Sequence, residues 1–151
     1  MSDYLAARSL SEYSIMTLNE CRNYLGNPYL FCLELAMLYR IQGQQDKMVQ
    51  EYLSYVTQSS ANIQYVKNVM QALLTKPDEL ESLERLLYDK VQQNPDVEVY
   101  SDLLIWVTMQ QKNFYASFIQ ARAYDKRYKR EGEKSLEVAR VALDNDDYDN
   151  A

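Results

Sequence analysis

One short stretch of the sequence, "PDELESLE" from Pro77, gathers residue types that acid–base catalysis uses. Asp78, Glu79, Glu81 and Glu84 lie close together at an expected helix start, and paired carboxylates are the raw material of general acid–base chemistry. The first turn of a helix also attracts acidic residues through the helix dipole alone. Because the second explanation needs no substrate, we interpret these acidic residues as stabilising the start of a helix.

The chain contains no histidine, which excludes His-ligated zinc and the Ser–His and Cys–His pairs of nucleophilic catalysis within it. It also lacks a glycine-rich phosphate loop and any spacing typical of metal ligands. Cys21 and Cys32 are too few for a disulfide framework, and we expect both as buried free thiols on apolar helix faces. We therefore predict a non-enzymatic protein that has neither a metal site nor a cofactor.

The overall composition limits the class of protein and of partner. The 151 residues carry a formal net charge of −6, which disfavours nucleic acid and anionic membranes as partners. No apolar run approaches the roughly 18 residues of a membrane span, so we expect no membrane insertion by this segment. With only 3 Gly and 3 Pro, the chain should form long helices joined by short turns. The cellular compartment cannot be read from these features.

Helical periodicity divides the chain into about eight helices. Ser9 and Glu12 have the spacing of a capping box ahead of a helix that ends near Leu25, and Pro28 then opens the next helix. Gly43 ends that second helix. The later helices are expected at about 45–58, 60–75, from Pro77, from Pro95, at about 113–130 and at about 133–143, with Ser60 and Asn113 at starts and Gly132 as a break. Short connections make consecutive helices antiparallel, so the predicted fold is all-α.

Residues of similar type recur at a period of 34 residues. The recurring sets are Leu35, Val69 and Leu103; Tyr39, Leu73 and Val107; Met48, Ser82 and Ala116; and the turn positions Gly43, Pro77 and Gln111. After Gly132 the register slips by one residue. The period gives repeats at 29–62, 63–96 and 97–130, preceded by the end of an earlier unit at 4–26 and followed by a truncated unit at 132–151.

These residues resemble the tetratricopeptide repeat family, whose unit is a pair of antiparallel helices. "LAMLYRIQGQQDKMVQEYL" matches the family motif through Ala36, Tyr39, Gly43, Met48 and Tyr52, and "LEVARVALDNDDYDNA" is similar to a further first helix and turn through Ala139, Ala142, Tyr148 and Ala151. The resemblance implies an α-α superhelix, a solenoid of about eight antiparallel helices that forms a single array over residues 1–151. It also implies a bacterial multi-repeat protein, of which we expect this chain to be an excised piece.

The resemblance further implies a concave groove lined by the first helix of each pair. Its groove positions are Leu33, Met37, Arg40, Ile41, Lys67, Asn68, Gln71, Ile105, Met109 and Arg140. Lys67, Asn68 and Gln71 are similar to one arm of a clamp for a C-terminal carboxylate, although the next unit offers Ser101, Asp102 and Ile105 in place of the other arm. The alternative is that these are solvated polar residues on helices.

Two further features allow a functional or a structural interpretation. The 14 tyrosines suit a recognition surface, but Tyr39 and Tyr52 occupy interior positions of the repeat. Trp106 is expected in the core or in the packing between repeats. The run "RAYDKRYKREGEK" puts Arg122, Lys126 and Arg130 on one helical stripe beside Lys129, where an acidic partner could bind. Cations near a helix C-terminus are also favourable without a ligand.

These observations predict a non-catalytic scaffold that binds a protein or peptide partner. The alternative is a structural spacer or self-association segment that has no peptide ligand. The identity of the partner and the oligomeric state stay open at this level.

Overall fold

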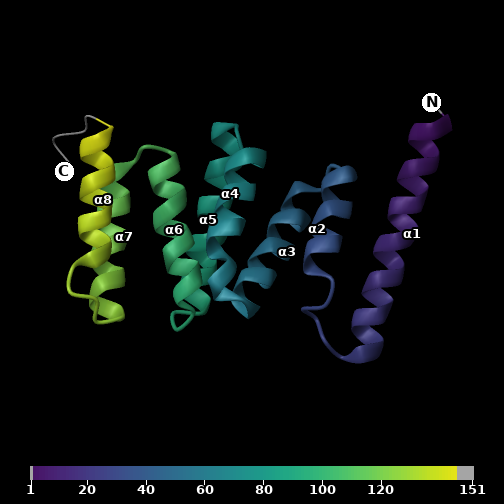
Figure 1. Ribbon diagram of the computed structural model, residues 1–151, viewed down its shortest axis with the longest axis horizontal. Helices are drawn as coiled ribbons and strands as arrows, with labels where there is room; N and C mark the ends of the chain where they lie inside the picture. Colours follow the sequence, from purple (N-terminus) through teal and green to yellow (C-terminus); the bar gives the residue numbers. More distant parts are fainter. Residues whose placement is uncertain (1, 146–151) are drawn as a thin grey trace. The chain divides into compact units, whose positions relative to one another are not determined.

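The computed structural model describes residues 2–145, and every regular element in that range is helical, without a strand (Figure 1). The α-helices are α1 (Ser2–Leu25), α2 (Cys32–Ile41), α3 (Gln45–Gln58), α4 (Ile63–Leu73), α5 (Pro77–Gln93), α6 (Glu98–Gln110), α7 (Phe114–Arg127) and α8 (Glu133–Asp144), with a 3-10 turn η1 (Ser60–Asn62) before α4. The all-α fold and the eight helices confirm the prediction. The family positions Tyr148 and Ala151 lie outside the described residues.

Several helix ends lie where local sequence signals placed them. Asn113 caps α7, because its side-chain oxygen accepts a hydrogen bond from the backbone N–H of Ala116 at 3.3 Å. Pro77 is the first residue of α5, and the Glu79 carboxylate accepts the backbone N–H of Lys76 at 3.3 Å. Gly132 breaks the chain before α8 with a left-handed φ of 85°.

Other predicted helix starts were wrong. Ser9 lies inside α1, which begins at Ser2, so it caps nothing. Pro28 lies in a turn, because the Asn27 side chain accepts the N–H of Tyr29 at 3.0 Å and holds the chain out of helical geometry until Cys32. Ser60 opens the 3-10 turn rather than α4, and α6 begins at Glu98 rather than Pro95.

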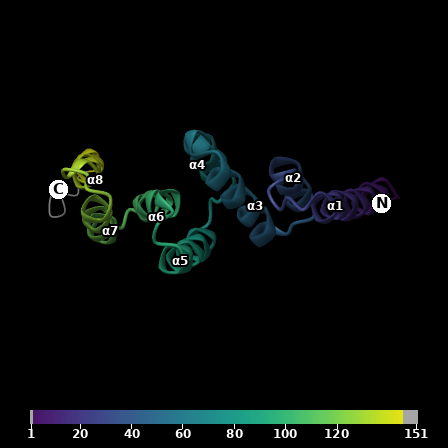
Figure 2. The ribbon, with the colours of Figure 1, turned by 90° about the horizontal axis from the view of Figure 1, so that it is seen from below.

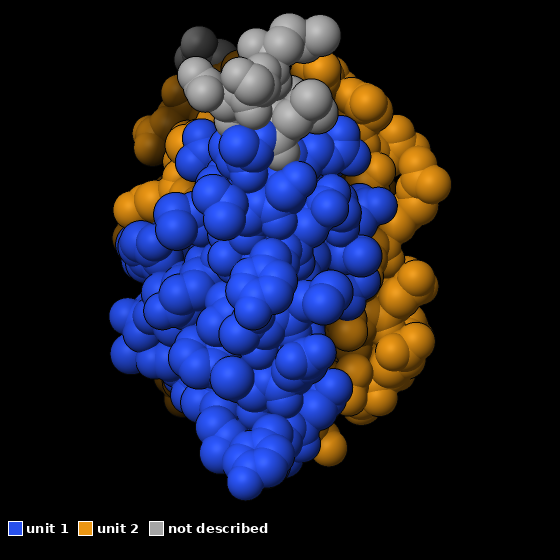
Figure 3. Space-filling view, turned by 90° about the vertical axis from the view of Figure 1, so that its right-hand side faces the viewer, with its two compact units in different colours: residues 1–66 blue, residues 67–151 orange. Residues whose placement is uncertain are grey.

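The chain divides into two compact units, unit 1 at residues 1–66 and unit 2 at residues 67–151 (Figure 3). In unit 1, α2 packs against both α1 and α3 (Figure 2). Its core is formed by apolar side chains of α2 and α3 that are at most 8% exposed, namely Leu35, Ala36, Tyr39, Met48, Val49, Tyr52, Leu53 and Val56. Tyr39 and Tyr52 are thus interior, as the sequence predicts.

A buried ion pair ties α1 to α3 in unit 1. Both terminal nitrogens of Arg22 bind the Glu51 carboxylate, at 2.9 and 2.6 Å, and both side chains are about nine-tenths buried. The bond to Glu51 raises the pKa of Arg22 above its ordinary value, against the opposing effect of burial. This bidentate contact orients α1 on the α2–α3 hairpin.

In unit 2, α6 packs against α5 and α7, and α7 packs against α8. Helix α6 is the central element, since residues 103–107 and Thr108 are all at most 7% exposed, Trp106 among them. One core cluster joins three helices through Ile105 of α6, Ala121 and Tyr124 of α7, and Val138 of α8. None of the described helices is long and apolar enough to cross a membrane.

The α2–α3 turn and the α6–α7 turn have the same backbone structure. Gln42 and Gln111 have φ,ψ of −77°,−5° and −75°,−3°, and Gly43 and Lys112 are both left-handed, with φ of 71° and 57°. The hydrogen bonds agree as well: the N–H of Gly43 donates to the carbonyl of Arg40, and the N–H of Lys112 donates to that of Met109. A helical hairpin therefore recurs 69 residues further along the chain.

This recurrence corrects the register inferred from the sequence. Gly43 corresponds to Lys112 and not to Gln111. The one-residue shift in the repeat register therefore occurs before residue 111, and not after Gly132 as the sequence predicted. Between α4 and α5 the turn differs, because Lys76 is extended and no residue from 74 to 76 is left-handed. The connection between α4 and α5 therefore lacks the turn that the α2–α3 and α6–α7 hairpins share.

Candidate functional site

The predicted groove residues of unit 1 form the solvent-facing stripe of α2. Met37 and Ile41 are 55% and 60% exposed, Arg40 is exposed, and Leu33 is half-buried. They lie opposite the buried stripe of α2 because the helix turns about 100° per residue. Exposed apolar side chains that lie one helical turn apart form a small apolar patch, which is a typical interaction surface.

Arg40 also lies near a group of tyrosines in unit 1. Burial is the main reason that the pKa of Tyr52 is raised; the hydroxyl of Tyr65 adds to the shift and the positive charge of Arg40 opposes it. Tyr65 is 48% exposed, and its ring meets that of Tyr55 edge-on, with centroids 6.4 Å apart. Arg40 has no ion-pair partner among the described residues. A cation beside aromatic hydroxyls is suited to a carboxylate.

In unit 2, the predicted groove residue Lys67 is already engaged by the chain itself. Its ammonium group lies 3.2 Å from Oδ1 of Asp102, and the two side chains are only 12% and 18% exposed. Lys134 of α8 binds the same oxygen at 3.0 Å and reaches Glu137 at 3.1 Å. Burial tends to lower the pKa of Lys134, but these carboxylates outweigh it and the pKa is raised. The network links α4, α6 and α8.

The remaining predicted groove residues have different surroundings. Asn68 and Gln71 of α4 and Arg140 of α8 are exposed. Ile105, by contrast, is 1% exposed and packs against Ala121, Tyr124 and Val138, so the structure corrects its placement in the groove. Met109 is half-buried against the same cluster. Ile105 corresponds to the buried Ala36 in the recurring hairpin, which explains its burial.

Glu98 joins the start of α6 to the end of α7. The Tyr124 hydroxyl donates to its carboxylate, and Arg130 lies 3.0 Å from the same oxygen. The hydrogen bond from Tyr124 is the main reason that the pKa of Glu98 is lowered; burial opposes this shift, and the contact with Arg130 adds to it. Helix α7 ends at Arg127, so Arg130 does not continue the helical stripe predicted with Arg122 and Lys126, and it is exposed in its pair with Glu98.

Asp125 caps a helix other than its own. Its carboxylate accepts the backbone N–H groups of Lys134 and Ser135, at 3.0 and 2.9 Å, and the Ser135 hydroxyl at 2.7 Å. Asp125 is 7% exposed, and burial alone would raise its pKa. The hydrogen bonds from Ser135 and Lys134 outweigh burial, so the pKa lies below its ordinary value.

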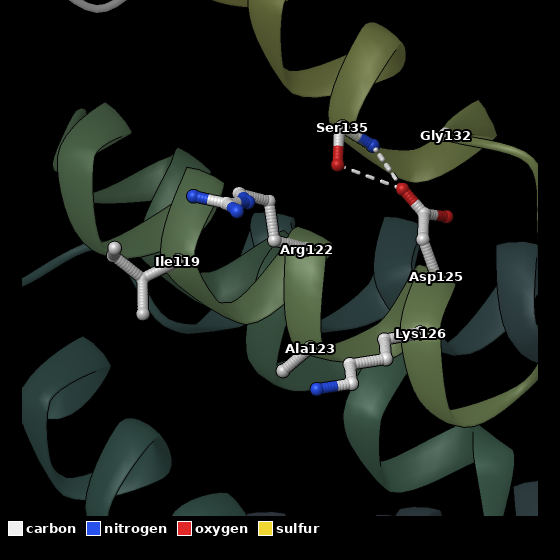
Figure 4. A pocket seen from close by; sticks show the side chains of 7 residues that line it. All are labelled: Ile119, Arg122, Ala123, Asp125, Lys126, Gly132 and Ser135. Atoms are coloured by element: carbon white, nitrogen blue, oxygen red, sulfur yellow. Dashed lines mark hydrogen bonds between the residues drawn. The ribbon is translucent and has the colours of Figure 1, made fainter.

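A hollow of about 480 Å³ opens beside this cap, between α7 and α8 (Figure 4). It is lined by Ile119, Arg122, Ala123, Asp125, Lys126, Gly132 and Ser135. Figure 4 shows Arg122 and Lys126 projecting from α7 on the side where Ile119 lies. The guanidinium of Arg122 lies 5.9 Å from the centre of the Phe118 ring.

Two of the four acidic residues considered for catalysis have structural partners. Glu79 caps α5, and Glu81 pairs with Arg85 at 3.1 Å where both side chains are exposed.

Burial raises the pKa of Cys32 to about 11, so its thiol is protonated at neutral pH. Cys32 is buried as expected, whereas Cys21 is half-buried, and both are free. Among the side chains that the structure describes, no three of His, Cys, Asp or Glu are grouped to hold a metal ion.

Sequence reasoning did not find the roles of Glu98 and Asp125, and it noted Asp102 only as a departure from the family pattern. Each of these acids binds a residue that lies 9 to 35 positions away in the chain. The sequence feature that could have identified such a residue is an acid inside an otherwise apolar helical stretch, such as Asp102 before "LLIWV". A buried acid must have a partner, but its identity depends on how the helices pack.

The fold and these surfaces define an all-α protein in which packed helices include a recurring hairpin. No protein-family model matches the chain, and no curated protein or solved structure matches it either. The assignment of function therefore depends on the chemistry of the surfaces alone.

Proposed function

We propose that this chain is a non-catalytic protein-interaction module, a tetratricopeptide-like solenoid that binds a peptide on the open face of α2. The observation that carries the proposal is the exposure of Met37 and Ile41, at 55% and 60%, beside Arg40, which forms no ion pair with any residue that the structure describes. An extended peptide would place apolar side chains on Met37 and Ile41 and a carboxylate against Arg40.

Two observations support the solenoid part of this proposal. The hairpin turn at Gly43 recurs at Lys112 with the same hydrogen bonds, as expected of repeated units. In unit 2, the contacts of Asp102 with Lys67 and Lys134 join α4, α6 and α8, which would be the first helices of successive pairs. Such first helices line one face when repeats stack.

Peptide selection followed by substitution tests the proposed site. Peptides selected from a random library against the full chain should bind at least about tenfold more weakly to Met37→Ser/Ile41→Ser, because two apolar contacts are lost. Arg40→Ala should weaken acidic peptides most. Leu136→Ser/Leu143→Ser is the matched control, since these leucines of α8 are similarly exposed, at 52% and 50%. Equal affinity for the wild type and the α2 variants would refute the site.

Self-association is a second candidate, supported by a different surface. Apolar side chains also face outward on α1, where Leu10, Tyr13, Met16 and Tyr24 are 67%, 68%, 58% and 91% exposed. Figure 3 views unit 1 from the side of α1. If this face joins two copies, light scattering will show a mass that rises with concentration and returns to the monomer in Tyr13→Ser/Met16→Ser. A concentration-independent monomeric mass would exclude this candidate.

A further inference from the structure

The hollow between α7 and α8 combines an apolar floor with two cations from one helical stripe. Ile119, Arg122, Ala123 and Lys126 follow one another at steps of three, one and three residues, so they share one side of α7. Ile119 is 46% exposed, and Ala123 is exposed beside it. These two side chains offer a place for an aliphatic group on the same side of α7 as the charged ones.

The two cations in this hollow have no ion-pair partner within the described residues. Neither Arg122 nor Lys126 forms an ion pair there, and the Phe118 ring is the contact of the Arg122 guanidinium. Of the lining residues, Asp125 alone carries a carboxylate. That carboxylate already accepts three hydrogen bonds from Lys134 and Ser135 at the start of α8. The hollow is therefore locally positive in a chain of net charge −6.

The recurring hairpin shows what the same positions do elsewhere in the chain. With the offset that relates Gly43 to Lys112, Arg122 corresponds to Leu53 of α3 and Lys126 to Thr57. Leu53 is 2% exposed, so the position of Arg122 is covered in the first hairpin, whereas Gln50, the counterpart of Ile119, is exposed there. In α7 the position of Leu53 is open and carries an arginine in place of the buried leucine. A segment that covers α7 must therefore bring negative charge to this position.

We propose that this hollow is a docking site for an acidic peptide segment of a partner protein. Two carboxylates of the segment bind Arg122 and Lys126, and a neighbouring aliphatic side chain lies on Ile119 and Ala123. Nucleic acid is a poorer fit, because two cations on a chain of net charge −6 cannot offset the repulsion of a phosphate backbone. The site lies on α7 and α8 and is separate from the α2 surface of the proposed function.

The test is a fluorescence polarisation titration of the full chain with a labelled synthetic peptide that carries glutamate pairs around leucine. Arg122→Glu/Lys126→Glu should weaken binding by about tenfold or more, since two attractive contacts become repulsive. Lys76→Glu/Arg85→Glu is the control: it changes the net charge equally at exposed side chains outside the hollow. Ile119→Ser should weaken binding about threefold through lost apolar contact, which a purely long-range charge effect would not do.

The same titration contains the results that would overturn the proposal. It fails if the glutamine counterpart of the peptide binds as tightly, if both charge-reversal variants lose the same affinity, or if Ile119→Ser changes nothing. It also fails if a single-stranded oligonucleotide of equal charge displaces the peptide at lower concentration. Circular dichroism of each variant separates lost binding from lost folding, because Ile119 is 46% exposed and its substitution should leave the helical signal unchanged.

Discussion

The ammonium group of Lys67 lies 3.2 Å from the same carboxylate oxygen of Asp102 that binds Lys134 at 3.0 Å. All three side chains are less than one-fifth exposed, so the two lysines share this carboxylate in a poorly solvated place, and Lys134 also binds Glu137. Removing that charge leaves like charges facing each other with little water to screen them. Asp102 therefore stabilises unit 2 more than a surface ion pair would.

Asp102→Asn should lower the free energy of unfolding by about 2 kcal/mol, because a partly buried charge network loses its only anion between the lysines. Urea denaturation followed by circular dichroism measures this change. Glu81→Gln is the control, since its pair with Arg85 is exposed and should contribute less than about 1 kcal/mol. Equal losses in the two variants would show that the network is not specially stabilising.

Asp125→Asn should destabilise the docking of α8 by about 1 to 3 kcal/mol, because one amide oxygen cannot replace a carboxylate that accepts three hydrogen bonds. The pKa of Asp125 is lowered from its ordinary value of 3.8, so its contribution is complete above that pH and is lost as the pH falls through the lower folded pKa. The difference between wild type and variant should therefore shrink on acidification. A constant difference from pH 7 to pH 2 would contradict this.

The helices and most of their ends could be predicted because the signals are local. Gly43, Pro77, Asn113 and Gly132 act through their own backbone or side chain within a few residues. The failures at Ser9 and Pro28 are also local, since α1 continues through Ser9 and the Asn27 side chain stabilises a competing turn. Helix type and approximate length were thus accessible from sequence.

The site was harder to predict because it depends on register. A helix turns about 100° per residue, so one extra residue between hairpins rotates every later side chain away from the face that a 34-residue period assigns. This is why Ile105 lies in the core and why Asp102, rather than Ser101, corresponds to Leu33. The partners of Asp102 and Asp125 follow from helix packing and have no spacing rule.

Ile105→Ala should cost about 2 to 4 kcal/mol of stability, as expected for a large-to-small change at a side chain that is 1% exposed among Ala121, Tyr124 and Val138. Met37→Ala is the comparison, because Met37 is 55% exposed and should change stability by less than about 0.5 kcal/mol. Thermal denaturation of both variants gives the values. If Ile105→Ala were as mild as Met37→Ala, Ile105 would be on the surface, as the resemblance implies.

Gly43 and Lys112 occupy the same left-handed position of the recurring turn. We therefore expect opposite changes in stability when the glycine is replaced at 43 and when a glycine is introduced at 112. Gly43→Ala should destabilise by about 1 kcal/mol, because a Cβ disfavours the φ of 71° although no atom lies within 4 Å of it. Lys112→Gly should instead stabilise by about 0.5 to 1 kcal/mol, since it relieves the same strain at a φ of 57°. Lys90→Gly, within α5, should destabilise by a similar amount and controls for the flexibility of glycine. Urea midpoints that move in the same direction for Lys112→Gly and Lys90→Gly would show that the two hairpin turns are not equivalent.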